Sequence, residues 1–170
     1  MGLDIYFHKT KRTEWERFQN DLAAYENLPK DKQTDGNNPY RDFDPEEIGY
    51  FRKVNFLMSF FKYDGNCEYK EIARERLQAL RDACAEIAKM KPVRIEITRY
   101  DYGGTEETKD YSLADQERCA ELLPTQSGFF FGNTDYDKWY FNAVKEVFVW
   151  VDGVLSGLAD DEVVLMYCWW

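Results

Sequence analysis

Hydrophobic and polar positions alternate near both ends of the chain. Close to the start, Leu3, Ile5 and Phe7 alternate with more polar residues, a period of two that predicts a strand with one buried face. The segment from Val163 to Trp170 is rich in β-branched and aromatic residues, which favours a final strand. The first strand is a natural partner for it, and residues 93–98 predict a further half-exposed strand by the same alternation.

Between these strands, apolar residues recur at helical spacing. The segment that follows the first strand predicts a helix up to Pro29, and a polar stretch from Lys30 to Asp42 predicts a surface loop. The strongest stripe follows Asp137, where Tyr140, Val144 and Val147 share one helical face. The predicted helices cover residues 13–28, 44–63, 70–90, 112–123 and 137–158. The second and third are joined by a short link, which favours an antiparallel helix pair.

These elements predict one α+β domain over residues 1–170, rich in helices, with a small and mostly antiparallel sheet that pairs the N- and C-terminal strands. The chain has 170 residues, of which 44% are hydrophobic and 17% aromatic. A chain of this size and composition can bury a sizeable core without disulfides or a structural metal.

The charge balance narrows the function classes. A formal net charge of -10 opposes binding to nucleic-acid phosphates, so we expect no direct nucleic-acid partner. The first residues carry a charge at Asp4 and lead into no long apolar run, which predicts neither a secretory signal nor a membrane span and favours a cytoplasmic protein. The four cysteines form no close pair, so we expect reduced thiols, no metal site and no cofactor.

The loop from Leu123 to Asp137 is the first candidate for a functional site. It combines turn formers, hydroxyl side chains and three adjacent phenylalanines immediately before the strongest predicted helix. The glycines at both ends of the aromatic run permit positive φ, and the rings are forced to point in different directions. An exposed ring can stack on a planar ligand, while polar side chains and backbone N–H groups of the loop can hold an anion. The predicted ligand-binding residues of this loop are Thr125, Gln126, Ser127, Gly128, Phe129, Phe130, Phe131, Asn133 and Asp135.

Each of these residues also has a purely structural interpretation. The rings can fill the core, and Thr125 and Ser127 can satisfy local backbone groups. The spacing of Asn133, Asp135 and Asp137 imitates the start of a calcium loop, but the later glycine and glutamate of such a loop are missing. Capping of the following helix is the favoured role for these side chains.

A second candidate segment lies in the predicted helix over residues 44–63. Arg52 and Lys53 supply positive charge, and Asn55 is an amide on or near the apolar face, where it needs a hydrogen-bond partner. All three can line a pocket. The alternatives are a surface ion pair between Arg52 and Glu46 or Glu47, and a buried Asn55 that fixes packing.

Three segments carry a resemblance to a known group of proteins. Residues 1–6 (MGLDIY), 50–55 (YFRKVN) and 123–137 (LPTQSGFFFGNTDYD) resemble those of small uncharacterised proteins encoded by phages, prophages and their bacterial hosts. The segment 92–111 is not part of the resemblance. In that family an Ile-His pair often follows the asparagine, whereas this chain has Phe56 and Leu57, so no role for that histidine carries over. The resemblance implies a phage or mobile-element setting and implies no activity.

Taken together, the sequence predicts a non-enzymatic binding or interaction protein. Its site is formed by the loop over residues 125–137 and the segment with Arg52, Lys53 and Asn55, and its ligand is a small nucleotide-like molecule or a host protein. The alternative is a hydrolase-like enzyme that acts on a phosphorylated or glycosidic substrate, with Asp135, Asp137 or His8 as acid or base. None of the common catalytic sequence motifs is present, so the catalytic residues of that alternative are unknown.

Overall fold

A central antiparallel sheet organises the chain. The computed structural model describes residues 2–101 and 103–170, so Met1 and Tyr102 lie outside the described residues. The sheet has the strand order β2-β1-β6-β3, and its strands are β1 (Asp4–Lys11), β2 (Glu46–Arg52), β3 (Tyr69–Ile72) and β6 (Glu162–Trp169). β1 pairs with β6 along its whole length. The predicted α+β fold, with paired terminal strands, is confirmed.

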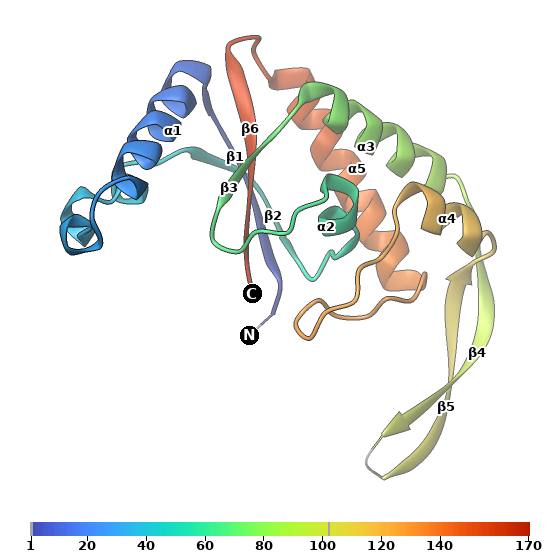
Figure 1. Cartoon of the computed structure of the whole chain (residues 1–170). Helices are drawn as coiled ribbons and strands as arrows, with labels where there is room; N and C mark the ends of the chain where they lie inside the picture. The colour runs from blue at the N-terminus through green and yellow to red at the C-terminus, as the bar shows by residue number, and fades with distance from the viewer. Residues whose placement is uncertain (1, 102) are drawn as a thin grey trace.

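Helices cover the two faces of this sheet unequally (Figure 1). On one side lie α2 (Phe56–Phe61), α3 (Arg74–Ile87) and α5 (Lys138–Gly157), with α4 (Gln116–Leu122) beyond them. On the other side lies α1 (Arg12–Glu26), followed by the short 3-10 turns η1 (Lys30–Lys32), η2 (Asp35–Asn37) and η3 (Pro39–Arg41). Strands β4 (Pro92–Asp101) and β5 (Gly104–Leu113) form a separate hairpin that extends away from the body of the molecule.

The alternation along β1 and β6 divides the core into two clusters. Ile5 and Phe7 point to the side of α5, where they join Val144, Val147 and other buried residues in the larger cluster. Val163 and Leu165 point to the other side, where Trp15 and Phe18 of α1 cover them. The predicted surface loop over residues 30–42 therefore folds back, since Tyr40 packs on this second cluster.

The helix predicted over residues 44–63 is wrong in its first half, because Glu46–Arg52 is strand β2 and only residues 56–61 are helical. The reason is a tertiary contact that the local pattern does not contain. Gly49 leaves space for the indole of Trp150, and a Cβ atom there would lie 2.4 Å from the Trp150 Nε1 atom. That indole donates a hydrogen bond to the Ile48 carbonyl oxygen at 2.7 Å. Packing against α5 and pairing with β1 thus override helical spacing.

The helix predicted over residues 70–90 begins later than expected. Its first residues belong to β3, an edge strand that pairs with β6, and the helix itself starts at Arg74. The predicted pairing of this helix with the preceding one is also wrong, since α3 packs mainly along α5. The segment between the two helices contains β3, which runs along the edge of the sheet beside β6 before α3 begins.

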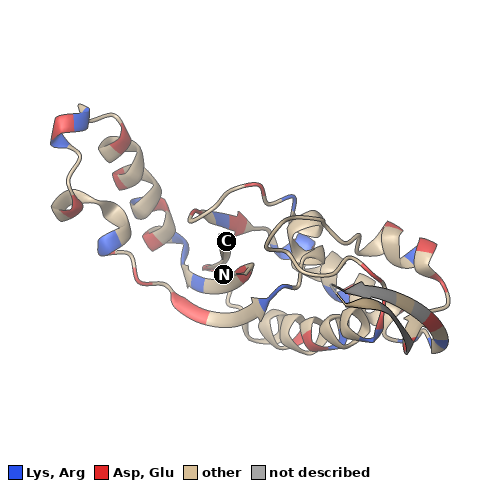
Figure 2. Cartoon of the chain, turned by 90° about the horizontal axis from the view of Figure 1, so that it is seen from below, with Lys and Arg blue, Asp and Glu red and all other residues tan. Residues whose placement is uncertain are grey.

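The charged residues are distributed over most elements of the chain. Figure 2 shows acidic and basic positions interleaved on α1 and on the helices of the opposite side. Many are paired, as in the contacts of Arg118 with Glu86 at 2.6 Å and with Glu121 at 2.9 Å. Within the described residues, no helix has the length and apolar character needed to cross a membrane.

The single histidine of the chain, His8, lies on β1. His8 packs beside Tyr6 and Tyr69, with ring centroids at 6.3 and 5.5 Å. Its Nδ1 atom is buried and has no hydrogen-bond partner among the described residues. Burial lowers the pKa of the His8 imidazole, while the carboxylates of Glu47 and Asp44 oppose this shift. The folded state therefore favours the neutral ring.

We predict that this histidine makes stability depend on pH near neutrality. Because its pKa is lower in the folded state, the unfolded chain binds the proton more readily, and the free energy of unfolding should fall as the pH decreases through about 6.5. Chemical denaturation between pH 7.5 and 5.5 measures this slope. The neutral variant His8→Gln should show a flatter dependence over the same range, and equal slopes for the two proteins would contradict the assignment.

Candidate functional site

The backbone of Leu3 joins the two segments that the sequence singled out. Its N–H group donates to the Phe130 carbonyl oxygen at 2.9 Å, and its own carbonyl oxygen accepts from the Lys53 N–H group at 2.8 Å. Leu3 lies just before β1 and is fully buried, so neither bond competes with water. The loop over residues 123–137 and the end of β2 are thereby fixed on either side of the same residue.

Asn55 supplies a second connection. It precedes α2 rather than lying within a long helix, and its side chain is buried. The Nδ2 atom donates to the carbonyl oxygens of Phe131 at 3.2 Å and Asn133 at 2.8 Å. The Oδ1 atom accepts from the Gln126 N–H group at 3.4 Å. One amide side chain therefore satisfies three backbone groups of the loop, and the interpretation of Asn55 as a packing determinant is the one that its contacts support.

A hollow of about 420 Å³ opens where these segments meet the first turns of α5. This volume falls within the range of small-molecule sites in proteins. Of the predicted ligand-binding residues, Arg52, Lys53, Asn55, Thr125, Asn133 and Asp135 line it, together with Gly132, Asp137, Trp139, Asn142 and Glu146 among others. The structure thus brings the cationic segment and the loop together around one concave surface.

Lys53 is held in an unusual backbone conformation at the edge of this hollow. Its φ angle is +59°, in the left-handed region that a side chain with a Cβ atom seldom adopts. Two glycines make room for its side chain. A Cβ atom on Gly132 would lie 3.3 Å from the Lys53 Cβ atom, and one on Gly2 would lie 3.3 Å from the Lys53 Cε atom. The lysine stem is therefore sandwiched between two backbone segments, which restricts where the ammonium group can reach.

Electrostatic partners distinguish the two cations of the site. Arg52 Nη1 lies 3.4 Å from Asp4 Oδ1, and the same carboxylate oxygen accepts a hydrogen bond from the Tyr50 hydroxyl at 2.5 Å. The predicted ion pair of Arg52 with Glu46 or Glu47 is thus replaced by one with Asp4. No carboxylate of the described residues forms an ion pair with Lys53. The Lys53 side chain is exposed.

The three phenylalanines, which the sequence placed in the site, do not line the hollow. Phe131 is buried in the larger core cluster and meets Trp170 edge to face at 5.5 Å. Phe130 packs against the same cluster, and Phe129 is 96% exposed at the tip of the loop. Gly128 is required because the Phe131 ring folds onto it, with a Cβ atom there only 2.7 Å from the ring. Positive φ is confirmed at Gly132 (+87°) alone of the two glycines.

The remaining polar residues of the loop hold its shape. Thr125 Oγ1 donates to the Thr134 carbonyl oxygen at 2.9 Å, and the Gln126 side chain accepts from Ser59 Oγ at 3.3 Å. Ser127 is exposed. Gln126 and Ser127 do not belong to the described lining of the hollow. The contact of Thr125 therefore fits the alternative interpretation, in which its hydroxyl group satisfies a local backbone group.

The predicted capping role at the start of α5 is confirmed. Asp137 Oδ1 accepts from the N–H groups of Trp139 at 2.9 Å and Tyr140 at 3.0 Å. Its Oδ2 accepts from Asn133 Nδ2 at 3.1 Å. Both carboxylate oxygens are thus engaged, and Asp137 is buried. Among the described residues, no group of three or more His, Cys, Asp or Glu side chains is arranged to hold a metal ion.

Trp139 is the aromatic residue of the hollow that sequence reasoning missed. It is 75% exposed, since it lies one position before Tyr140 and so off the buried stripe of α5. The sequence does contain a signal for this role, since Trp139 is a large aromatic residue on the polar side of an amphipathic helix. Glu146 lies further along the same helix and also lines the hollow.

No protein-family model matches the chain, and searches of curated proteins and of solved structures also find no match.

We predict that Asn55→Ala destabilises the protein by about 1 to 3 kcal/mol, because buried carbonyl groups of the loop lose their donor. Ser59→Ala is the matched control, since it removes only one bond to a side chain of the same loop, and we expect a change within about 0.5 kcal/mol. Urea denaturation measures both. Equal losses for the two variants would show that Asn55 does not anchor the loop.

We also predict that Gly132→Ala is destabilising by about 1 to 2 kcal/mol, because its backbone is left-handed and the added methyl group approaches Lys53. Gly153→Ala in α5 is the control. A Cβ atom at Gly153 meets open space, so helix propensity alone should stabilise the protein by about 1 kcal/mol. Thermal unfolding of the two variants should therefore give midpoint shifts of opposite sign, and shifts of the same sign would contradict this.

Proposed function

We propose that this protein binds a small nucleotide-like ligand in the hollow between the 123–137 loop, the end of β2 and the start of α5. The observation that carries the proposal is the placement of Lys53. A lysine in a left-handed conformation, with its stem packed between two glycines and with no ion-pair partner in the described part of the chain, stands at the edge of a ligand-sized hollow. Unfavourable backbone conformations persist where the surroundings impose them, and they concentrate at ligand sites.

The lining supports the ligand class by its chemistry. Lys53 supplies positive charge for a phosphate group, whereas the charge of Arg52 is balanced by Asp4. Trp139, in the first turn of α5, offers an exposed indole on which a planar base can stack. Glu146 and Asp135 are acceptors for sugar hydroxyls or for exocyclic amino groups. A ligand that joins an anionic group to a planar, hydrogen-bonding ring therefore matches both ends of the site.

The two alternatives predicted from the sequence receive less support. Recognition of a host protein by the loop rests on Phe129 alone, whose ring stands apart from the hollow. For a hydrolase-like enzyme, His8 packs beside Tyr6 and Tyr69 in the sheet, whereas Asp137 is occupied by helix capping. These groups do not assemble into an acid–base pair. A cytoplasmic location and a phage or mobile-element setting belong to the same proposal.

The test is ligand-dependent stability of the full chain. We expect adenosine 5′-monophosphate, used as a probe with one phosphate and one base, to raise the thermal midpoint. A ligand at 100 times its dissociation constant stabilises the folded state by about 2.7 kcal/mol, which is several degrees for a chain of this size. Lys53→Gln and Trp139→Ala should each remove most of this shift.

Phe129→Ala is the matched control, because it removes another exposed aromatic side chain that lies outside the hollow. It should leave the ligand-induced shift unchanged. Two results would overturn the proposal: a shift that survives in the Lys53→Gln variant, or the absence of any shift with the mononucleotides of all four bases at millimolar concentration.

A further inference from the structure

Four tyrosines form a continuous row across the central sheet. Tyr50, Tyr6, Tyr167 and Tyr69 lie on four adjacent strands and are direct partners in the register, Tyr50 with Tyr6, Tyr6 with Tyr167, and Tyr167 with Tyr69. Directly opposed residues of antiparallel strands point to the same face. Successive ring centroids are 5.0, 6.3 and 5.0 Å apart. Tyr40 of η3 extends the row, since its ring stacks on Tyr69 at 6.1 Å. We call these five residues the tyrosine row.

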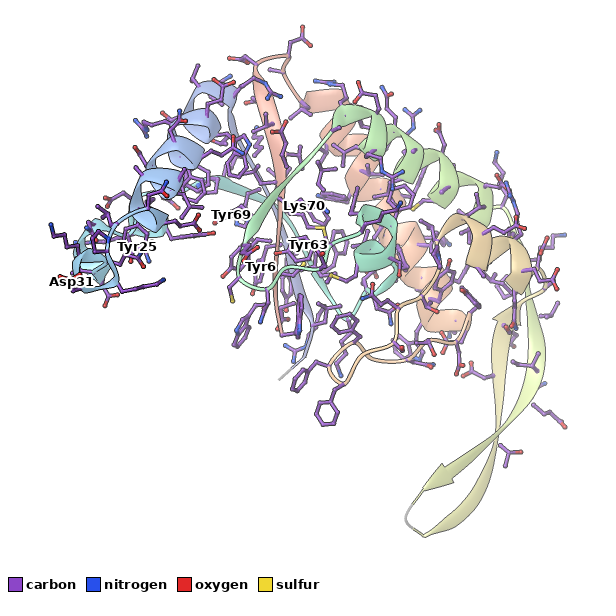
Figure 3. The ribbon with its side chains drawn as sticks, in the orientation of Figure 1. Tyr6, Tyr25, Asp31, Tyr63, Tyr69 and Lys70 are labelled. Carbon is purple, nitrogen blue, oxygen red and sulfur yellow. The ribbon has the colours of Figure 1, made fainter. Side chains whose placement is uncertain are left out.

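Tyr50, Tyr6 and Tyr167 lie on the part of this face beyond the cluster of Trp15 and Phe18, whereas Tyr40 and Tyr69 pack against that cluster. One step along the strands, Leu165 is fully buried beneath Trp15 and Phe18 of α1. The tyrosines themselves are only partly buried, and Tyr50 is 46% exposed. Figure 3 labels Tyr6 on β1 and Tyr69 on β3, and β6 runs between these two strands. A contiguous aromatic surface of this kind on a protein face marks an interaction site more often than isolated exposed rings do.

The two ends of the row differ in charge. At the β2 end, Arg52 is neutralised by the ion pair with Asp4. At the other end, the row borders a hollow of about 220 Å³ between α1 and the rings of Tyr40 and Tyr69, and Glu26 lines it. Burial, followed by the carboxylates of Glu68 and Glu26, raises the pKa of Tyr40. The end of the row at Tyr40 is therefore acidic.

We propose that the tyrosine row is a docking surface for an extended, proline-rich segment of a partner protein, with a basic residue of that segment lying over the acidic end. Polyproline segments dock on aromatic-lined surfaces, because their conformation is already extended and their carbonyl groups are free to accept hydrogen bonds. Such a chain rises by about 3.1 Å per residue, so two residues match the spacing between neighbouring rings. The Tyr50 hydroxyl already donates to Asp4, so the Tyr6 and Tyr69 hydroxyl groups are the donors for those carbonyls.

Charge selects this occupant over another ligand of aromatic surfaces. Single-stranded nucleic acid also stacks on aromatic rings, but it needs a basic groove to hold its phosphates. The net charge of -10 and the carboxylates at the Tyr40 end oppose that ligand. A peptide that carries arginine or lysine is instead attracted to the same end. This surface is separate from the nucleotide-like site, which opens between the loop and α5.

The experiment uses the full chain and a synthetic peptide of eight prolines with two arginines at one end. We expect NMR titration with millimolar peptide to shift the resonances of Tyr6, Tyr50 and Tyr167. Tyr50→Ala should weaken binding at least fivefold, whereas Tyr50→Phe keeps the ring and should weaken it less. Tyr111→Ala is the matched control, since Tyr111 is 44% exposed but lies on the β4–β5 hairpin, and it should leave the affinity unchanged.

Three results would overturn the inference. The first is no shift at the row in the unaltered protein. The second is equal binding by a peptide in which glycine and serine replace the prolines, which would reduce the effect to charge alone. The third is stronger binding of a single-stranded oligonucleotide at the same residues. The titration of the unaltered chain decides the question even if Tyr50→Ala fails to fold.

Discussion

The two backbone hydrogen bonds of Leu3 are the constraint on which the site depends. The residue stands at the entrance to β1, the strand that is paired on both sides, with β2 and with β6. Its carbonyl oxygen holds Lys53 beyond the end of β2, and its N–H group holds Phe130 of the long loop. Because β1 is central to the sheet, these contacts transmit its rigidity to two segments that are about 75 residues apart in the chain. The hollow forms where they meet.

The side chains of β1 alternate between the two faces of the sheet. Ile5 and Phe7 enter the core with α3 and α5, whereas Tyr6 and His8 point to the side of α1. Asp4 connects the two regions that we assign to ligands, since its carboxylate binds Arg52 of the hollow and Tyr50 of the tyrosine row. A buried carboxylate with one cationic and one phenolic partner fixes both side chains. The hollow and the tyrosine row therefore share this carboxylate as a common border.

Much of the fold could be predicted from periodicity. The stripe of α5 was unambiguous because Tyr140, Val144 and Val147 repeat on one face and Asp137 caps the start. The pattern of β2 was ambiguous, because the spacing of Ile48 and Phe51 fits a helix equally well. The packing of Trp150 against Gly49 favours the strand. The sequence correctly predicted that the loop and the segment with Arg52 and Lys53 lie around one hollow. Which aromatic ring reaches the hollow was not, because burial of Phe131 and exposure of Trp139 follow from packing between distant elements.

Hydrogen exchange of individual amides tests the central role of Leu3 most directly. If its backbone is fixed between the loop and the end of β2, the Leu3 and Lys53 amides should be protected to the same degree as the amides of Ile5 and Phe7 within β1. If the Leu3 and Lys53 amides exchanged as fast as the exposed Ser127 amide, the loop and the end of β2 would not be joined at Leu3. This result would contradict the proposed site.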